Sequence, residues 1–433
     1  MIQRVIIQLG LKIYRSYAHV SLVFFYCLWN NSFIIIPVKV RKVNMLTVLL
    51  FLGILSLLVF VHEWGHFTTA KKCGMKVYEF GFGFPPRAIG WYKDPVTKRL
   101  VRVVGKGKNS LKETVGGGER VQEFPSTLYS INWLPLGGFV KIKGESGEAR
   151  GEKDSFVGRP VWQRLLVLVA GVFMNFILAA ALLSVGLMIG LPADFSGGID
   201  ERAIIVEPPS VLVQHVLDGS PAEQAGFQLG DTVLEIDDVS ILNASQMIAY
   251  VRDHNETPLT VLVERDGVLS TKEVTPADLD QSGERRLGVV LADAGVIRYP
   301  WYHALWRGIA AAFFGAVNII VAFFYLIKNL IIGEGLAFDV SGPVGIAVLV
   351  GQSARLGFHY LLNVTAMISL SLAVINFLPI PALDGGRALF VILEKIFRRP
   401  VSMKHEQLAH TIGFLLLLGL IVIVTVRDVI GLF

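Results

Sequence analysis

The segment MLTVLLFLGILSLLVFVHEWGH, residues 45–66, joins an uncharged apolar run to a cluster of polar side chains. The run Met45–Val61 approaches the roughly 20 residues that a helix needs to cross the hydrocarbon core of a bilayer. It ends at His62, Glu63 and His66, and ionisable side chains at membrane depth are costly unless they are used. We therefore expect a membrane-spanning helix that carries a functional site.

Further apolar runs of similar length follow at Leu165–Leu191, Ile309–Ile332, Tyr360–Leu383 and Thr411–Val426. Hydrophobic residues make up 53% of the chain and charged residues 17%, whereas an average soluble protein carries about 25% charged residues. This composition predicts an α-helical polytopic membrane protein. It excludes an ordinary cytosolic enzyme, a disordered chain and a nucleic-acid-binding protein. Cys27 and Cys73 are the two cysteines, so neither a disulfide framework nor a cysteine-based metal site is expected.

The polar cluster at the end of the first run fits the pattern H-E-x-x-H. Residues four apart lie on the same face of a helix, so His62 and His66 can bind one Zn²⁺ ion through their ring nitrogens. Glu63 follows the first ligand and can take a proton from water at the metal. The alternative is a pair of interfacial histidines beside a glutamate that reaches the bilayer surface.

A catalytic zinc site uses three protein ligands and keeps one position open. The stretch NFLPIPALDGG, residues 376–386, offers Asp384 at the end of another apolar run. Pro379 and Pro381 cannot continue a helix, and non-helical backbone at membrane depth is tolerated only inside protein or beside a wet cavity. The alternative is a plain loop with an exposed aspartate.

Together the two motifs resemble the site-2 protease family of intramembrane zinc metalloproteases, and within it the bacterial regulator-of-sigma-E branch. The resemblance extends from about Met45 to Phe433. It includes the stretches GFGF at 81–84, LGGFVK at 136–141, AGVFMNF at 170–176 and SGP at 341–343. Val172 stands where many relatives have proline, a departure that concerns helix geometry and not the chemistry.

This resemblance implies an active enzyme that cuts transmembrane segments of single-span membrane proteins in regulated intramembrane proteolysis. Anti-sigma factors and remnant signal peptides would be typical substrates. His62, His66 and Asp384 are implied to bind one zinc ion per chain. Glu63 is implied to act as general base and then as the acid that protonates the leaving amine. Asn376 is implied to help hold the unwound substrate.

Two glycine-rich stretches resemble the membrane-re-entrant β-hairpin elements of that family. Because a helix hides its carbonyls, a substrate must be extended before it is cut, and an exposed edge strand can pair with an extended peptide. The strands around residues 81–84 and 136–142 are the candidates, with Gly137, Gly138 and Phe139 as expected substrate-binding residues. The alternative is a surface hairpin without this role.

Residues 203–292 mix acidic and basic residues with short alternating runs, as is typical of a water-soluble α+β unit. The stretch DGSPAEQAGFQLGDTVLEID, residues 218–237, resembles the central part of a PDZ domain. Asn243–His254 would then be the groove helix and Arg286–Leu291 the strand beside it, in the circularly permuted order of bacterial PDZ domains. One inserted PDZ-like domain is expected. It would filter substrates by size or bind a new peptide C-terminus, and the alternative is a packing module.

The predicted organisation has four parts. Residues 45–192 hold the first two spans, the H-E-x-x-H motif and the re-entrant β region, and residues 203–292 form the PDZ-like domain. Residues 300–433 hold an interfacial helix, a third span with the L-D-G-G motif and a fourth span. Residues 1–44 lack an obvious signal-peptide cleavage site, so Met45 is interpreted as the biological start, with one additional membrane anchor as the alternative.

Basic residues indicate the orientation in the membrane. They follow the first span at Lys71, Lys72 and Lys76, and follow the Asp384 motif at Lys395, Arg398 and Arg399. The positive-inside rule places both groups in the cytoplasm. The active site would then face the cytoplasmic side of a bacterial inner (cell) membrane, with the PDZ-like domain outside.

The run Ile309–Ile332 conflicts with this scheme if it crosses the membrane. A crossing would place Asp384 about 30 Å, the thickness of the hydrocarbon core, from the two histidines. A zinc ligand must lie about 2 Å from the metal. We therefore predict that this run lies along the outer interface or dips in without crossing, which leaves four spans.

Two other functions stay open on the sequence alone. A membrane zinc protease with an aqueous chamber would cut soluble or lipidated peptides, but it typically uses a downstream glutamate as third ligand. A non-catalytic PDZ-bearing scaffold or chaperone need not keep Glu63. The expected partners are single-span membrane protein substrates, the lipid bilayer and a peptide C-terminus at the PDZ-like domain, and no nucleic acid.

Overall fold

The computed structural model describes residues 45–105, 112–116, 119–145, 149, 151–195, 200–217, 219–265, 267–279, 284–333, 341–399 and 401–430. The predictions for residues 1–44 fall outside this part of the chain. Within it, the helices long and apolar enough to cross a membrane are α3 (Met45–Lys72), α4 (Val161–Ile189), α7 (Trp301–Ile332), α9 (Phe358–Phe377) and α11 (Met403–Ile430). The prediction of a polytopic helical membrane protein is confirmed.

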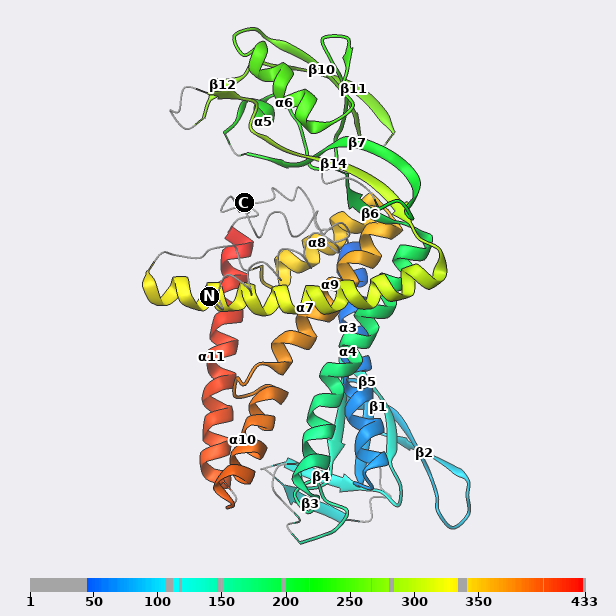
Figure 1. Cartoon of the computed structure of the whole chain (residues 1–433). Helices are drawn as coiled ribbons and strands as arrows, with labels where there is room; N and C mark the ends of the chain where they lie inside the picture. The colour runs from blue at the N-terminus through cyan, green and yellow to red at the C-terminus, as the bar shows by residue number, and fades with distance from the viewer. Residues whose placement is uncertain are drawn as a thin grey trace.

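The long helices differ in direction. Helices α3, α4, α9 and α11 run lengthwise through the molecule, whereas α7 lies across them (Figure 1). The N-terminal half of α7 packs on α4 and α9 through small side chains such as Ala304 and Ala312, which are fully buried. A Cβ on Gly308 would lie 2.1 Å from Oγ of Ser184 on α4, so the two helices are in close contact there.

Helices α3, α4 and α9 are held together by close backbone approach and polar contacts. A Cβ on Gly65 of α3 would lie 2.4 Å from the carbonyl oxygen of Ala170 on α4. The Ser369 hydroxyl of α9 donates to the carbonyl of Asn175 on α4 at 2.9 Å. In lipid, where apolar side chains gain little from leaving the solvent, small residues and hydrogen bonds of this kind hold helices together.

The fourth apolar run is not helical to its end. Helix α9 stops at Phe377, and helix α10 (Asp384–Phe397) begins only after residues 378–383. Pro379 and Pro381 lie in this break, in keeping with the loss of backbone donors at proline. A short helix that the sequence did not separate, α8 (Pro343–Leu356), precedes α9 and is divided from it by Gly357.

A sheet lies against the second half of α3. Its strands are β1 (Val77–Lys93), β2 (Leu100–Val104) and β5 (Leu128–Ile142), in the order β2-β1-β5, while β3 (Lys112–Gly116) and β4 (Glu119–Glu123) form a separate pair. Residues 79–82 of β1 have partners in both halves of β5; Phe80, for example, is registered with Tyr129 and with Val140. Residues 138–142 therefore lie at an edge of the described sheet, and residues 79–82 do not.

The prediction that residues 81–84 offer a free strand edge is therefore wrong for 81 and 82. Gly81 is paired with Ser130 on one side and Phe139 on the other, and Phe82 with Ile131 and Gly138. The alternation of small and aromatic residues gives a strand, but it does not tell how β5 bends around it. The segment around residues 136–142 is left as the candidate edge.

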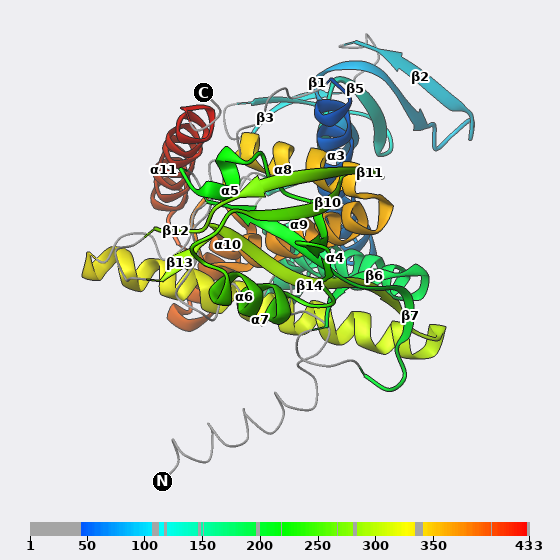
Figure 2. The same cartoon turned by 90° about the horizontal axis from the view of Figure 1, so that it is seen from above.

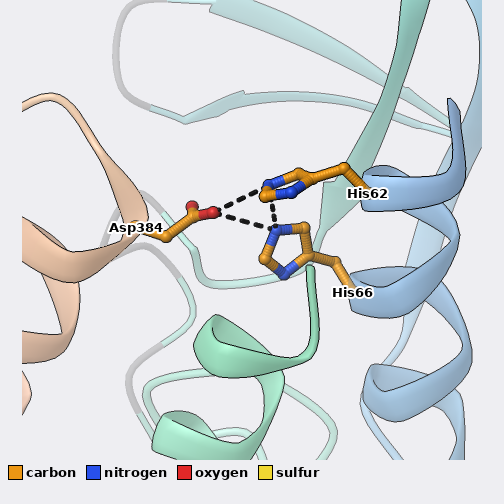
Figure 3. Close-up of side chains that lie close together, drawn as sticks. All are labelled: His62, His66 and Asp384. Carbon is orange, nitrogen blue, oxygen red and sulfur yellow. Dashed lines mark hydrogen bonds and ion pairs between the residues drawn. The ribbon is translucent and has the colours of Figure 1, made fainter. Parts of the chain in front are cut away.

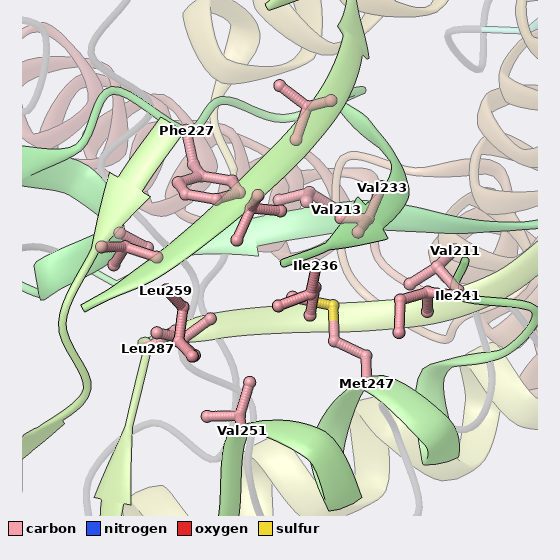
Figure 4. Close-up of a cluster of buried hydrophobic side chains, with 14 residues drawn as sticks. Val211, Val213, Phe227, Val233, Ile236, Ile241, Met247, Val251, Leu259 and Leu287 are labelled. Atoms are coloured by element: carbon pink, nitrogen blue, oxygen red, sulfur yellow. The ribbon is translucent and has the colours of Figure 1, made fainter. Parts of the chain in front are cut away.

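The soluble unit begins where α4 ends. Its elements are β6 (Leu191–Asp194), β7 (Ile204–Val216), α5 (Pro221–Gln224), β8 (Thr232–Ile236), β9 (Val239–Ser240), α6 (Ala244–Asp253), β10 (Leu259–Arg265), β11 (Val268–Val274), β12 (Ala277–Asp278), β13 (Arg285–Arg286) and β14 (Val289–Arg298). The main sheet has the order β11-β10-β8-β7-β14-β6, with β9 beside β8. Its core includes Val213, Ile236 and Met247 (Figure 4).

Helix α6 follows the predicted groove helix closely, because the Asn243 side chain caps it by accepting a hydrogen bond from the Gln246 backbone at 2.8 Å. The predicted strand Arg286–Leu291 differs from the structure. It is interrupted at Leu287 and Gly288, and Gly288 has φ +82°, a conformation that does not continue a strand. The continuous strand β14 starts at Val289.

The soluble unit is joined to the helices by paired strands and not by a free linker. Strand β6 pairs with β14, and the backbone N–H of Tyr299 just beyond β14 donates to the carbonyl of Leu187 in α4 at 2.7 Å. The unit lies at the end of the helices opposite to the β1–β5 sheet (Figure 1), and from above its strands cover α4 and α9 (Figure 2).

Candidate active site

The H-E-x-x-H motif lies on a helix, as predicted. Helix α3 continues from the apolar run to Lys72, so His62 and His66 lie one turn apart on the face that packs against α4. Both histidines are buried, whereas Glu63 is half-buried. The helix thus turns two imidazole rings toward the interior of the molecule.

Asp384 reaches the histidines because the chain breaks after α9. Residues 378–383 fold back, with Ala382 at φ +83°, and Asp384 stands in the first turn of α10. A carboxylate in this position is favoured by the partial positive charge of the helix N-terminus. The side chains of His62, His66 and Asp384 point toward one another from two separate helices (Figure 3).

The three ligand atoms form a compact triangle. The Asp384 Oδ2 atom lies 2.8 Å from Nε2 of His62 and 3.2 Å from Nε2 of His66, and the two nitrogens are 3.1 Å apart. Ligand atoms about 2 Å from a tetrahedral zinc ion are separated by roughly 3.3 Å. Two imidazole nitrogens and a carboxylate oxygen at this spacing therefore fit a zinc ion, and no other triad of this kind is found in the described residues.

The outer nitrogens of both histidines have partners on α4. Nδ1–H of His66 donates to the carbonyl of Val167 at 2.8 Å, which leaves the Nε2 lone pair free for a metal. Nδ1 of His62 lies 3.5 Å from the side-chain amide of Asn175, whose oxygen is buried without a hydrogen-bond partner in the described structure. Turned by 180°, the amide presents this oxygen to Nδ1–H and fixes the same tautomer.

Gly171 on α4 was not predicted as a site residue, although it lies in the stretch 170–176. A Cβ at Gly171 would lie 2.4 Å from Nε2 of His66 and 2.7 Å from Nε2 of His62. The glycine therefore provides the space in front of the two ligand nitrogens. The sequence holds one signal for this, a small residue in the second apolar run, but small residues there also serve helix packing.

Glu63 is not one of the three converging groups. Its carboxylate interacts with the charges of His66, Asp384 and Glu145 and with the backbone of Val140 in β5. It is therefore close to both the ligand triangle and strand β5. Such a carboxylate can exchange protons with a water or an amine held beside the triangle.

Ion pairs attach α10 to the rest of the site. Arg387, one turn after Asp384, pairs with Glu145 just beyond β5. Glu394 on the same helix pairs with buried Arg164 of α4 at 3.0 Å. These contacts join the helix that begins at Asp384 to both elements around the histidines.

The predicted substrate-binding residues fall in two places. Gly137 lies directly on α3, where a Cβ would come within 2.7 Å of Val59. A Cβ on Gly138 would lie 2.9 Å from the Gly81 carbonyl oxygen of β1 and 3.7 Å from Phe60 of α3, and the Phe139 ring packs over Gly81. Asn376 is half-buried in the last turn of α9, outside the ligand triangle. The structure therefore places Gly137 and Gly138 between α3 and β1 with Phe139 over β1, and leaves Asn376 apart from them.

Residues 50–103 and 112–420 match the sequence model of peptidase family M50. This match spans both motifs and most of the chain. The chain belongs to peptidase family M50, the site-2 protease family. It is therefore an intramembrane zinc metalloprotease of the site-2 type, which acts in regulated intramembrane proteolysis. The resemblance found in the sequence is confirmed.

Relatives match over almost their whole length. The chain is 33% identical over 376 residues to a Clostridium perfringens protein whose name assigns it provisionally to the zinc metalloproteases. This match covers 87% of this chain and 96% of that one. It is 30% identical over 444 residues to zinc metalloprotease RasP of Oceanobacillus iheyensis, covering 90% of this chain and 100% of that one. With its apolar helices, the chain is a multi-pass bacterial membrane protein.

Solved PDZ domains match a smaller part of the chain. The PDZ domain of an SdrC-like protein from Listeria monocytogenes is 20% identical, with a TM-score of 0.19, and the match covers 20% of this chain and 93% of that domain. At this identity and score the match carries no functional argument.

Proposed function

We propose that this protease cuts peptide bonds inside the transmembrane segments of single-span membrane proteins, such as anti-sigma-factor-like proteins or remnant signal peptides. The observation that carries the proposal is the meeting of His62, His66 and Asp384 between helices long and apolar enough to span a bilayer. A site between membrane-spanning helices can be reached by a substrate segment that itself lies in the membrane.

In this proposal His62, His66 and Asp384 hold one zinc ion per chain. A zinc ion in such a site polarises a carbonyl and makes water more acidic. Glu63 takes the proton of the attacking water and later gives it to the leaving amine. Gly171 keeps the space in front of the ring nitrogens open for these groups.

The edge of the described sheet at residues 138–142 is proposed to hold the substrate in extended form. An extended peptide can add to a strand edge through main-chain hydrogen bonds. The Val140 backbone interacts with Glu63, so a peptide at this edge would pass close to the general base. Gly137, Gly138 and Phe139 are proposed to shape this strand against α3, and Asn376 is proposed to hold the substrate from the other side of the site.

Substrate helices that unwind easily are expected to be cut faster. Gly or Asn in a helix lowers its stability by about 0.5–1 kcal/mol relative to Ala or Leu, and 1.36 kcal/mol corresponds to about tenfold in rate. Replacing two such residues by Leu in a single-span test substrate should slow cleavage about tenfold. The measurement is the rate in liposomes, with the cut located by mass spectrometry and the Glu63→Gln enzyme as blank.

A cut outside the transmembrane segment, or equal rates for both substrates, would contradict the proposal. A soluble peptide of the same sequence is the matched control. Faster cleavage of that peptide than of the membrane-embedded substrate would instead favour a protease with an aqueous chamber.

The organisation of the chain is also proposed. Residues 45–192 would form the first two spans with the site and a β region that dips into the membrane, residues 203–292 a PDZ-like domain, and residues 300–433 the rest. At the bends of the β1–β5 sheet, Phe84, Trp133 and Leu134 are exposed, and such apolar tips are compatible with insertion into lipid. Filtering of substrates, or binding of a new C-terminus, by the soluble unit stays a prediction.

Helix α7 is proposed to lie in the outer part of the membrane without crossing it. It runs across α3, α4, α9 and α11 (Figure 1), so Asp384 can meet the histidines from the same side. Trp301 and Trp306 near its start are exposed, as aromatic residues at membrane interfaces often are. The basic residues after α3 and α10 would face the cytoplasm, and the soluble unit would lie outside.

Cysteine labelling tests this topology. In a cysteine-free background, single cysteines at Ile248 of α6, Trp301 and Ile331 should react with a membrane-impermeant maleimide added to the outer side, because all three positions are exposed. Arg398→Cys, at the opposite end, should react only after permeabilisation. Labelling of Ile331→Cys only from the cytoplasm would contradict the four-span topology. Ala304 is unsuitable because it is fully buried.

A further inference from the structure

We propose that His410 of α11 is a positioning residue for Asp384. His410 holds the backbone of the loop 378–383 and thereby orients Asp384. The inference rests on the proposed role of Asp384 as a metal ligand. It concerns a histidine that does not belong to the ligand triangle and that lies on a different helix from both ligand-bearing segments.

The contact that carries the inference is a single hydrogen bond. The backbone N–H of Ala382 donates to Nδ1 of His410 at 2.8 Å. Ala382 lies two residues before Asp384 and has φ +83°, a left-handed conformation that is unfavourable for a non-glycine residue. A partner for its N–H is therefore needed to keep this turn, and the direction of Asp384 depends on the turn.

The acceptor role fixes the state of the imidazole ring. Because Nδ1 accepts, the ring proton lies on Nε2. That Nε2 atom is buried and has no hydrogen-bond partner among the described residues. The ring also contacts Phe390 of α10, with 5.5 Å between ring centroids. His410 thus touches the loop before Asp384 and the helix after it.

The same face of α11 fits tightly against the loop one turn further on. A Cβ on Gly413 would lie 2.4 Å from the carbonyl oxygen of Pro381. His410 and Gly413 are three residues apart and share a helix face. The loop is therefore supported by a donor contact at Ala382 and by backbone packing at Pro381.

Helix α11 is itself fixed at its far end. The Asp428 Oδ2 atom accepts from the backbone N–H groups of Gly342 and Gly345, at 2.9 and 2.8 Å, at the start of α8. Between the two ends, α11 exposes a row of apolar side chains, among them Leu415, Leu416, Ile423 and Val426. The two hydrogen bonds of Asp428 thus fix the position of α11 along its axis. They therefore also fix the position of His410 beside the loop.

The test compares variants of His410 in the full-length protein. His410→Phe keeps a ring against Phe390 but removes the acceptor, and His410→Asn puts an amide oxygen near the position of Nδ1. Exposed His405 on the same helix gives the matched control, His405→Ala. Zinc affinity is measured by competition with a chelator, and hydrogen exchange of the peptide that contains Ala382 is measured in the zinc-free protein.

His410→Phe is expected to bind zinc about tenfold more weakly, within the range found when outer partners of metal ligands are removed, and to exchange the Ala382 amide faster. His410→Asn should stay within about threefold of the unsubstituted protein on both measures, and His405→Ala should match it. A purely structural role would change thermal stability in both His410 variants without this difference in zinc affinity.

The inference is overturned if His410→Phe keeps full zinc affinity and amide protection. It is also overturned if folded His410→Asn binds zinc as weakly as His410→Phe. Should His410→Phe fail to fold, His410→Leu takes its place with the same expectation. If the unsubstituted protein itself binds no zinc, the proposed ligand set fails, an outcome distinct from equal affinities in all variants.

Discussion

Glu63→Gln is expected to keep zinc and lose cleavage. Glutamine has nearly the shape of glutamate but cannot accept the proton of the attacking water, and general-base catalysis contributes about 10²–10⁴-fold to a rate. Because Glu63 is not among the three converging ligand atoms, its replacement should leave the metal in place. The measurement is the cleavage rate of a membrane-embedded substrate together with the zinc content of the purified protein.

Asp384→Ala and His62→Ala provide the contrast, because each removes one atom of the ligand triangle. Both should lose zinc and activity together, whereas Glu63→Gln separates the two. Cleavage by Glu63→Gln within a few-fold of the unsubstituted rate would show that another group moves the proton. Loss of zinc from a folded Glu63→Gln protein would mean that Glu63 is a ligand and not a base.

Gly171→Ala is expected to abolish zinc binding with a single methyl group. That methyl would lie 2.4 Å from Nε2 of His66 and 2.7 Å from Nε2 of His62. It would therefore occupy the space that the two ring nitrogens and a metal ion bound to them need. The His66 ring cannot easily withdraw, because its other nitrogen is bound to the Val167 carbonyl at 2.8 Å. Zinc content should fall to background, and cleavage with it.

Gly53→Ala is the matched control for this substitution. Gly53 lies on α3, the helix of the histidines, and a Cβ there meets no atom within 4 Å. It should bind zinc and cleave as the unsubstituted protein does. Stoichiometric zinc in Gly171→Ala would show that α3 and α4 can separate at this point, and that the glycine is not required for the site.

The sequence was sufficient for the parts of the site that depend on local pattern. Two histidines four apart at the end of an apolar run favour a helix that brings them to one face, and two prolines two residues apart favour a break in a helix. Asp384 was expected as the third ligand because a catalytic zinc site needs one more protein ligand beside His62 and His66, and the resemblance to a family implied the same set. The spacing of the chain alone does not relate positions 322 residues apart.

Contacts between elements could not be predicted in the same way. In the sequence, Gly171 cannot be distinguished from a glycine that only serves helix packing. Its position opposite two ring nitrogens depends on the rotation of α4 against α3. His410 is a lone histidine near the start of an apolar run, which on sequence alone is an interfacial residue. The alternation in residues 81–84 predicts a strand but does not reveal that β5 pairs with both of its sides.

The split of the ligand set along the chain has a consequence for biosynthesis. A nascent chain that has inserted α3 already carries His62, Glu63 and His66, yet it lacks the carboxylate that lies 322 positions later. During synthesis it therefore presents two imidazoles and the proposed base, but only two of the three proposed metal ligands. With the proposed ligand set, proteolytic competence would arise only after the late segment that bears Asp384 has been made.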